Sequence, residues 1–178
     1  MGGYVQSFKQ KFPDKVTPEM EEAFHGGKSK ISVFKLEHVE GSEDEFPGIM
    51  FTSKENVARK KGPYVTEVQL KMNRTVSPQS PPRRDDIVFM VTSAPGKDES
   101  LRKYGENLRE AYFKAIDYIM KGHNAKECFH RVYTEFYKEH NKEFVENMVK
   151  CNYDGAIIGM QDPHYVVFNP KTIQIVTQ

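Results

Sequence analysis

The spacing of apolar residues changes twice along the chain, and this order constrains the fold more than any single motif does. Residues 98–149 repeat apolar side chains at intervals of three and four, which is typical of amphipathic helices, here on either side of Gly122. The segments before and after them show the alternation and the short apolar runs of strands. Because neither group of strands can bury an apolar face alone, the two groups must meet in space. We therefore expect one α+β domain over residues 1–178, with a helical pair inserted at about 98–149.

Local patterns predict the individual elements. We expect a helix at 17–24, where Thr17 and Pro18 form a typical helix start, and a second helix at 52–61. Residues 77–86 contain three prolines, and we expect them to form an exposed loop. Strands are expected at 30–37, 64–72, 87–92, 156–160 and 165–176.

Composition excludes several classes of function. The chain has 178 residues, enough for one domain with a sizeable core. Its 26 basic and 25 acidic residues leave a net charge of +1, which does not favour wholesale binding to nucleic acid or to an anionic membrane. No apolar run approaches the roughly 20 residues that span a bilayer, and the N-terminus lacks the apolar stretch of a secretory signal. We expect a cytoplasmic protein with no membrane partner.

Metal and thiol chemistry have little support in the sequence. His123, Cys128 and His130 lie close together, but their spacing does not place them on one face of a helix, so we expect no metal site. Cys151 has no local signature of a nucleophile, and we expect both cysteines to be reduced structural thiols. Gly26 and Gly27 match neither a phosphate-binding loop nor a Rossmann turn.

Three separated segments carry a resemblance. They read "FHGG" at 24–27, "GIMFTSKENVA" at 48–58 and "YDGAIIGMQDPHYVVFNPKTIQIV" at 153–176. Their order and spacing resemble the ADP-ribosyltransferase fold of the diphtheria-toxin and poly(ADP-ribose) polymerase type, and most closely its members in bacterial and phage polyvalent proteins. The resemblance spans about residues 20–176. It implies a split β-sheet core in which NAD, as substrate, lies in a cleft between two small sheets.

The first motif implies the contacts to nicotinamide. By the resemblance, His25 hydrogen-bonds the nicotinamide ribose, the backbone of Gly26 holds the carboxamide, and Gly27 keeps the turn open. Glycine suits this position because its backbone can approach a ring with no Cβ in the way. The structural alternative is a histidine in a turn, satisfied by a backbone carbonyl.

The second motif departs from the family pattern. The family tyrosine that stacks on nicotinamide is replaced by Met50, whose sulfur can still contact a ring. Strand alternation sends Phe51 to the opposite face, so we expect it in the core unless the register slips by one. Tyr64 is a second candidate for a wall of the cleft. Thr52 and Ser53 are expected to cap the following helix, with a place for Ser53 in the cleft as the alternative.

The third motif departs further, because His164 stands where the family places a glutamate. That glutamate binds the ribose 2′-hydroxyl and stabilises the oxocarbenium-like transition state through its negative charge. Neutral histidine lacks that charge, although it can accept a hydrogen bond or act as a base near pH 7. Gln161 or Asp162 could enter the site from the preceding turn.

The resemblance implies a mono-ADP-ribosyltransferase that cleaves NAD at the nicotinamide glycosidic bond and transfers ADP-ribose to a macromolecular acceptor. We expect a protein acceptor, because the surface has almost no net charge, and a bacterial or phage effector acting in the cytosol. Two alternatives remain. One is an inactive module of the same fold that binds NAD, ADP-ribose or a protein partner, and the other is an unrelated α+β interaction protein.

Overall fold

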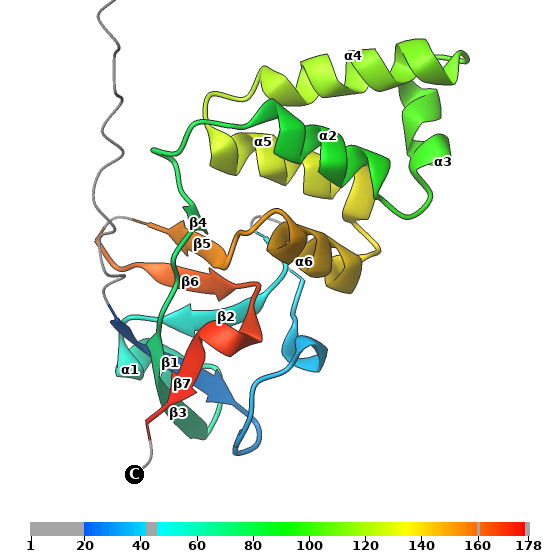
Figure 1. Cartoon of the computed structure of the whole chain (residues 1–178). Coiled ribbons are helices and arrows are strands. Elements are labelled where there is room, and N and C mark those ends of the chain that lie inside the picture. The colour runs from blue at the N-terminus through cyan, green and yellow to red at the C-terminus, as the bar shows by residue number, and fades with distance from the viewer. Residues whose placement is uncertain (1–19, 42–45, 160, 177–178) are drawn as a thin grey trace, which may run out of the picture.

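A computed structural model describes residues 20–41, 46–159 and 161–176. In this part of the chain the strands form one curled sheet in the order β4-β5-β6-β2-β1-β3-β7 (Figure 1). Neighbouring strands are antiparallel except for β4 and β5, which are parallel. The strands are β1 (Glu21–Gly27), β2 (Ile49–Thr52), β3 (Tyr64–Leu70), β4 (Thr75–Val76), β5 (Gly155–Ile158), β6 (His164–Val167) and β7 (Ile173–Ile175).

Strands from the two ends of the sequence lie side by side in this sheet. β6 pairs with β2, β7 pairs with β3, and β5 pairs with β4. The helical segment is thus an insertion between strands that come from both sides of it in the sequence and form one sheet. The expected α+β class is confirmed.

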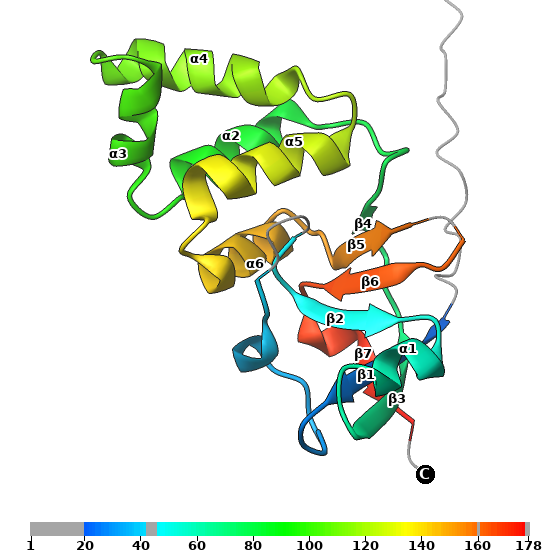
Figure 2. The same cartoon turned by 180° about the vertical axis from the view of Figure 1, so that it is seen from behind.

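All helices but the first gather at one end of the sheet within the described part of the chain (Figures 1 and 2). They are α1 (Glu55–Arg59), α2 (Arg84–Thr92), α3 (Lys97–Leu101), α4 (Leu108–Met120), α5 (Ala125–Val132) and α6 (Asn141–Lys150). In both views, α2 to α5 lie beyond the β4–β5 edge, with α6 between them and the strands, whereas α1 lies at the opposite end beside β1 (Figures 1 and 2). No helix within the described ranges is long and apolar enough to cross a membrane.

Two groups of buried side chains hold these parts together. The larger group joins the helices to one face of β5 and β6, through residues such as Met90, Phe144 and Val166. The smaller group lies on the other face, between the strands and the segment 31–39, and includes Phe34 and Phe51. Phe51 is only 3% exposed, which confirms its predicted place in the core.

The segment 87–92 is a helix, and the predicted strand is wrong. Ile87, Met90 and Val91 are buried at helical spacing, and Asp85 and Asp86 lie in the first turn of α2, where the helix dipole favours acidic side chains. A short run of β-branched and aromatic residues cannot be distinguished by periodicity from a buried helix. Here neighbouring helices α4, α5 and α6 cover the segment.

Two predictions near the N-terminus are also wrong. Residues 21–24 of the expected helix 17–24 belong to strand β1, which pairs with β3 at every residue from Glu21 to Gly27. Met20 has no regular structure, and residues 17–19 lie outside the described part. The expected strand at 30–37 is absent, and this segment is irregular up to a short 3₁₀ turn at Leu36–His38.

The inserted helical pair is in fact a longer series of helices that starts at Arg84 rather than at about residue 98. The first predicted helix is divided into α3, a 3₁₀ turn at Arg102–Tyr104 and α4. The second is divided into α5, a π-helical turn at Tyr133–Tyr137 and α6. Asn107 and Asn124 begin α4 and α5, because each side chain accepts hydrogen bonds from backbone N–H groups of the first turn. Gly122 lies in the connection between these two helices, as expected.

Candidate functional site

A groove opens where strands β1 and β2 stop pairing. The ladder between them consists of the single pair Phe24↔Thr52, whereas β1 pairs with β3 along its whole length. A hollow of about 230 Å³ lies at this split, and β1, β2, the start of β6 and the last turn of α1 all contribute to its lining. Of the predicted site residues, His25, Gly26, Met50, Phe51 and His164 line it together.

His25 is held in one orientation at the split. Its Nδ1 lies 2.9 Å from the carbonyl oxygen of Met50, and because a carbonyl can only accept, Nδ1 carries the proton and donates it. The ring packs against Phe34 at 5.2 Å and Phe51 at 5.6 Å between centroids. In the neutral ring this bond leaves Nε2 as the acceptor. Nε2 lies 3.5 Å from the position that a Cβ would take if residue 27 were not glycine.

The backbone of Gly26 faces the split. On the side of β3 that faces away from β1, the carbonyl of Glu67 accepts a hydrogen bond from the N–H of Val176. On the same side, the N–H of Lys71 donates to the carbonyl of Thr172. The backbone hydrogen-bonding groups of successive residues point to alternate sides of a strand. In β1, Phe24 and every second residue from it therefore direct these groups toward β2, and the residues between them direct theirs toward β3. Gly26 therefore directs its N–H and C=O toward β2, at a position that the ladder with β2 does not reach.

Gly26 also has a structural reason to be glycine. The carbonyl of Ala58 in α1 occupies the volume that a side chain at residue 26 would need. Gly62 similarly lets the chain after α1 pass close to the backbone of Gly27. The sequence alone suggests close approach of a ligand at this position, and the structure adds close approach of a helix.

Several lining residues on three strands share one face of the sheet, whereas His25 and Phe51, which pack on each other and on Phe34, lie on the opposite face. Direct partners in an antiparallel ladder point to the same side, so Phe24, Thr52 and His164 lie in a row across β1, β2 and β6. Met50 lies on the same face as Thr52, two residues earlier, and is partly buried. His164 is exposed at the first position of β6.

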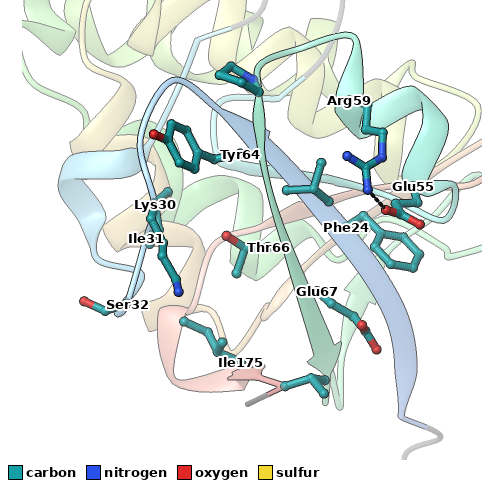
Figure 3. Close-up of a pocket in the computed structure, with 13 residues that line it drawn as sticks. Phe24, Lys30, Ile31, Ser32, Glu55, Arg59, Tyr64, Thr66, Glu67 and Ile175 are labelled. Atoms are coloured by element: carbon teal, nitrogen blue, oxygen red, sulfur yellow. Dashed lines mark hydrogen bonds and ion pairs between the residues drawn. The ribbon is translucent and has the colours of Figure 1, made fainter. Parts of the chain in front are cut away.

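Tyr64 does not join this group. It is 50% exposed and lines a second, larger hollow of about 760 Å³ beside β3 (Figure 3). There it lies with Lys30, Ile31 and Thr66 on one side of the strand, while Arg59 and Glu55 form an ion pair on the other. Residues of α1 line both hollows, and Phe24 contributes to both, so α1 lies between them.

Ser53 and Asp162 lie next to the groove but outside its lining. The backbone N–H of Ser53 donates to the carbonyl of Pro163 at 3.2 Å, and no side chain caps α1. The nearest to a cap is Thr52, whose hydroxyl accepts from the Lys54 N–H at 3.3 Å. Asp162 forms an ion pair with Lys54 at 2.5 Å between Oδ1 and Nζ. The loop before His164 is thus attached to the start of α1.

Sequence reasoning missed two charged residues of the groove, Glu40 and Lys61. Glu40 reaches it because its backbone forms two hydrogen bonds with Gly48, at 2.9 Å and 3.0 Å, just before β2 begins. Lys61 follows α1, and its Cβ lies 3.1 Å from the place of a Cβ on Gly26. Neither residue belongs to a local motif, so no signal in the sequence identifies them.

Thiol chemistry has no place at this groove. Both cysteines are buried and unpaired by disulfides, as expected, and neither contributes to the lining. Burial raises the pKa of Cys151 to about 12, so that thiol stays protonated at neutral pH. Within the described ranges, no three His, Cys, Asp or Glu side chains gather closely enough to hold a metal ion.

Comparison with known proteins gives little further information. No protein-family model matches the chain, and no curated protein matches it. Among solved structures, the crystal structure of an anti-CRISPR protein is similar at 10% sequence identity with a TM-score of 0.39, over 90% of this chain and 98% of that one. A similarity this low transfers neither fold nor function.

Proposed function

We propose that the protein is a mono-ADP-ribosyltransferase that uses NAD in the groove between β1 and β2. One observation carries the proposal: His25 and Gly26 of β1, Met50 of β2 and His164 of β6 line one small groove although they are far apart in sequence. These are the positions to which the resemblance assigns contacts with NAD. The acting compartment would be the cytosol of a bacterium or of a phage-infected cell.

The groove suits one end of the dinucleotide. Its volume of about 230 Å³ is below the range of roughly 300–1,000 Å³ that encloses a whole drug-sized ligand. We expect it to hold the nicotinamide riboside while the adenylate part extends outside. His25 Nε2 would accept a hydrogen bond from a ribose hydroxyl, and the N–H and C=O of Gly26 would bind the carboxamide.

The proposed reaction breaks the bond between C1′ of the ribose and the nicotinamide nitrogen. The electron pair of that bond leaves with nicotinamide, which becomes neutral, and C1′ acquires positive charge in the transition state. A nucleophilic oxygen, nitrogen or sulfur of the acceptor then forms the new bond to C1′ and loses its proton. His164, exposed at the edge of the groove, is placed to accept that proton or to bind a ribose hydroxyl. We expect a protein acceptor, since the chain carries almost no net charge.

A binding module without catalysis is the second candidate, and two observations favour it. Met50 and His164 stand in the places of the family tyrosine and glutamate. Asp162, the nearby acidic side chain of the β6 loop, is paired with Lys54 and lies outside the lining of the groove.

Incubation of the purified full chain with NAD labelled in the adenylate phosphate, together with a bacterial lysate, separates these candidates. Transferase activity predicts time-dependent nicotinamide release and label on lysate protein, both abolished by His25→Ala. The matched control is His123→Ala, because His123 is exposed and does not line the groove. Saturable NAD binding without nicotinamide release would leave the binding module, and absence of binding at millimolar NAD would remove both candidates.

A further inference from the structure

The groove between β1 and β2 carries opposite charges on different walls. Of the described residues that line it, Glu40 is the one carboxylate and Lys61 is the one lysine or arginine. Both side chains belong to exposed residues, so water and salt screen them in part. Neither residue takes part in an ion pair found within the described part of the chain.

The backbone fixes the direction of Glu40. Its two hydrogen bonds with Gly48 extend the ladder of β2 by one antiparallel pair. Gly48, Met50 and Thr52 alternate along one strand and share a face. As the direct partner of Gly48, Glu40 starts from the same face as Met50, which lines the groove.

Lys61 enters from the opposite wall. It follows α1, which rests on the backbone of Gly26, and its Cβ lies 3.1 Å from the place of a Cβ on Gly26. The aliphatic stem of Lys61 therefore begins beside Gly26, and its ammonium group can extend along the groove toward solvent.

NAD carries its charges in a matching order. The oxidised nicotinamide ring is positive, the pyrophosphate is negative, and a ribose separates them. We propose that Glu40 faces the cationic nicotinamide riboside and that Lys61 faces the pyrophosphate. This inference rests on the proposed function. Glu40, in the segment before β2, would supply the negative charge that His164 lacks. A carboxylate near C1′ stabilises the positive charge that develops there as nicotinamide leaves with the bonding electrons.

The redox forms of the dinucleotide test the charge assignment without requiring turnover. NADH has the same pyrophosphate as NAD but a neutral nicotinamide ring, and ADP-ribose has no ring at all. Titration calorimetry of the full chain with the three ligands should show tighter binding of NAD than of NADH. In Glu40→Gln, this preference should fall about threefold, as expected for one partly exposed charge pair, with ADP-ribose binding unchanged.

Lys61→Met should have a different signature, because all three ligands carry the pyrophosphate. Their affinities should fall together by about threefold, and the NAD to NADH preference should stay the same. The matched controls are Glu37→Gln and Lys60→Met, exposed neighbours that do not line the groove. If the wild type turns over NAD, Glu40→Gln should also lower kcat by about tenfold, beyond the roughly threefold loss of NAD affinity, since the carboxylate interacts more strongly with the charge on C1′ in the transition state.

The outcomes separate this inference from the proposed function. If the wild type binds NAD and Glu40→Gln keeps the wild-type preference for NAD over NADH, the charge assignment is wrong while the transferase proposal stands. If the wild type binds none of the three ligands at millimolar concentration, both are wrong. If Glu37→Gln lowers the preference for NAD over NADH as much as Glu40→Gln does, the effect comes from the general surface charge and not from Glu40, and the role of Glu40 is wrong.

Discussion

The carbonyl oxygen of Ala58 occupies the volume that a side chain at residue 26 would need, so helix α1 rests directly on the backbone of Gly26. The same helix forms one wall of the groove, through Ala58 and the neighbouring Val57. The distance between α1 and β1 therefore sets the width of the candidate site. A glycine at this position has a structural role whether or not a ligand binds.

Gly26→Ala should accordingly destabilise the protein. The added methyl group meets backbone atoms, which cannot move away as a side chain could, so we expect the free energy of unfolding to fall by about 1–3 kcal/mol. Gly27→Ala is the matched control, because the nearest atom to a Cβ there is His25 Nε2 at 3.5 Å, an ordinary contact. We expect a change within about 1 kcal/mol in that variant. Urea denaturation measures both, and equal effects would contradict the close contact of α1 with Gly26.

Long-range topology was more predictable than some local elements. The strands β6 and β7 follow from apolar runs near the C-terminus, and the β-rich, helical, β-rich order requires that they meet strands from the N-terminal half. The segment 21–24 has helix-favouring glutamates, and local propensity favoured the wrong structure there. Seven pairs with β3 outweigh that propensity.

The family resemblance grouped candidate-site residues that lie on strands, and it did not identify those that lie between the strands. His25, Met50 and His164 each occupy a strand position, and pairing of β1, β2 and β6 brings them together. Glu40 and Lys61 depend instead on the path of the chain before β2 and after α1. That path is set by the Glu40–Gly48 hydrogen bonds and by packing of α1, neither of which has a local sequence pattern.

His164 and Asp162 can be distinguished by substitution. His164 lines the groove, whereas Asp162 lies outside its lining and is paired with Lys54, with both side chains more than half exposed. Under the proposed function, His164→Ala should lower NAD turnover by about tenfold or more, because it removes a group placed to accept a proton. Asp162→Asn should leave turnover within about threefold, since exposed ion pairs contribute little. Nicotinamide release measures both. A larger loss of turnover in Asp162→Asn than in His164→Ala would show that Asp162, and not His164, acts in the site.

A polar network joins the sheet to the helices. Arg74 donates to the Asp86 carboxylate at 3.0 Å, to the Tyr153 hydroxyl at 2.9 Å and to the Cys151 carbonyl at 2.9 Å, and its guanidinium lies 4.0 Å from the centre of the Tyr153 ring. The Asp86 side chain is only 14% exposed, so removing its partner leaves a poorly solvated charge. We expect Arg74→Met to lower the free energy of unfolding by about 2–4 kcal/mol.

The control for Arg74 is a second arginine with an exposed partner. Arg84 pairs with Asp117 at 3.5 Å, and their side chains are 51% and 67% exposed. Arg84→Met should therefore change the free energy of unfolding by no more than about 1 kcal/mol. Chemical denaturation of both variants gives the comparison. Similar losses in the two would mean that the network around Arg74 contributes no more than a surface ion pair.

Stability should fall at high pH, because several buried groups hold their protons tightly in the folded state. Burial is the largest cause that raises the pKa of Cys151, Tyr137, Tyr153 and Tyr165 to about 12 in each case. In the unfolded chain these groups lose their protons at their ordinary, lower pKa values. Between about pH 9 and pH 12 the folded state therefore binds more protons than the unfolded state, and the free energy of unfolding must decrease as pH rises.

Urea denaturation from pH 7 to pH 11 should show no loss from these groups below about pH 9 and a steady fall above it. Cys151→Ala should make that fall shallower, because it removes one of the contributing groups, and a stability that stays constant up to pH 11 would show that these side chains are not buried from water as the structure places them.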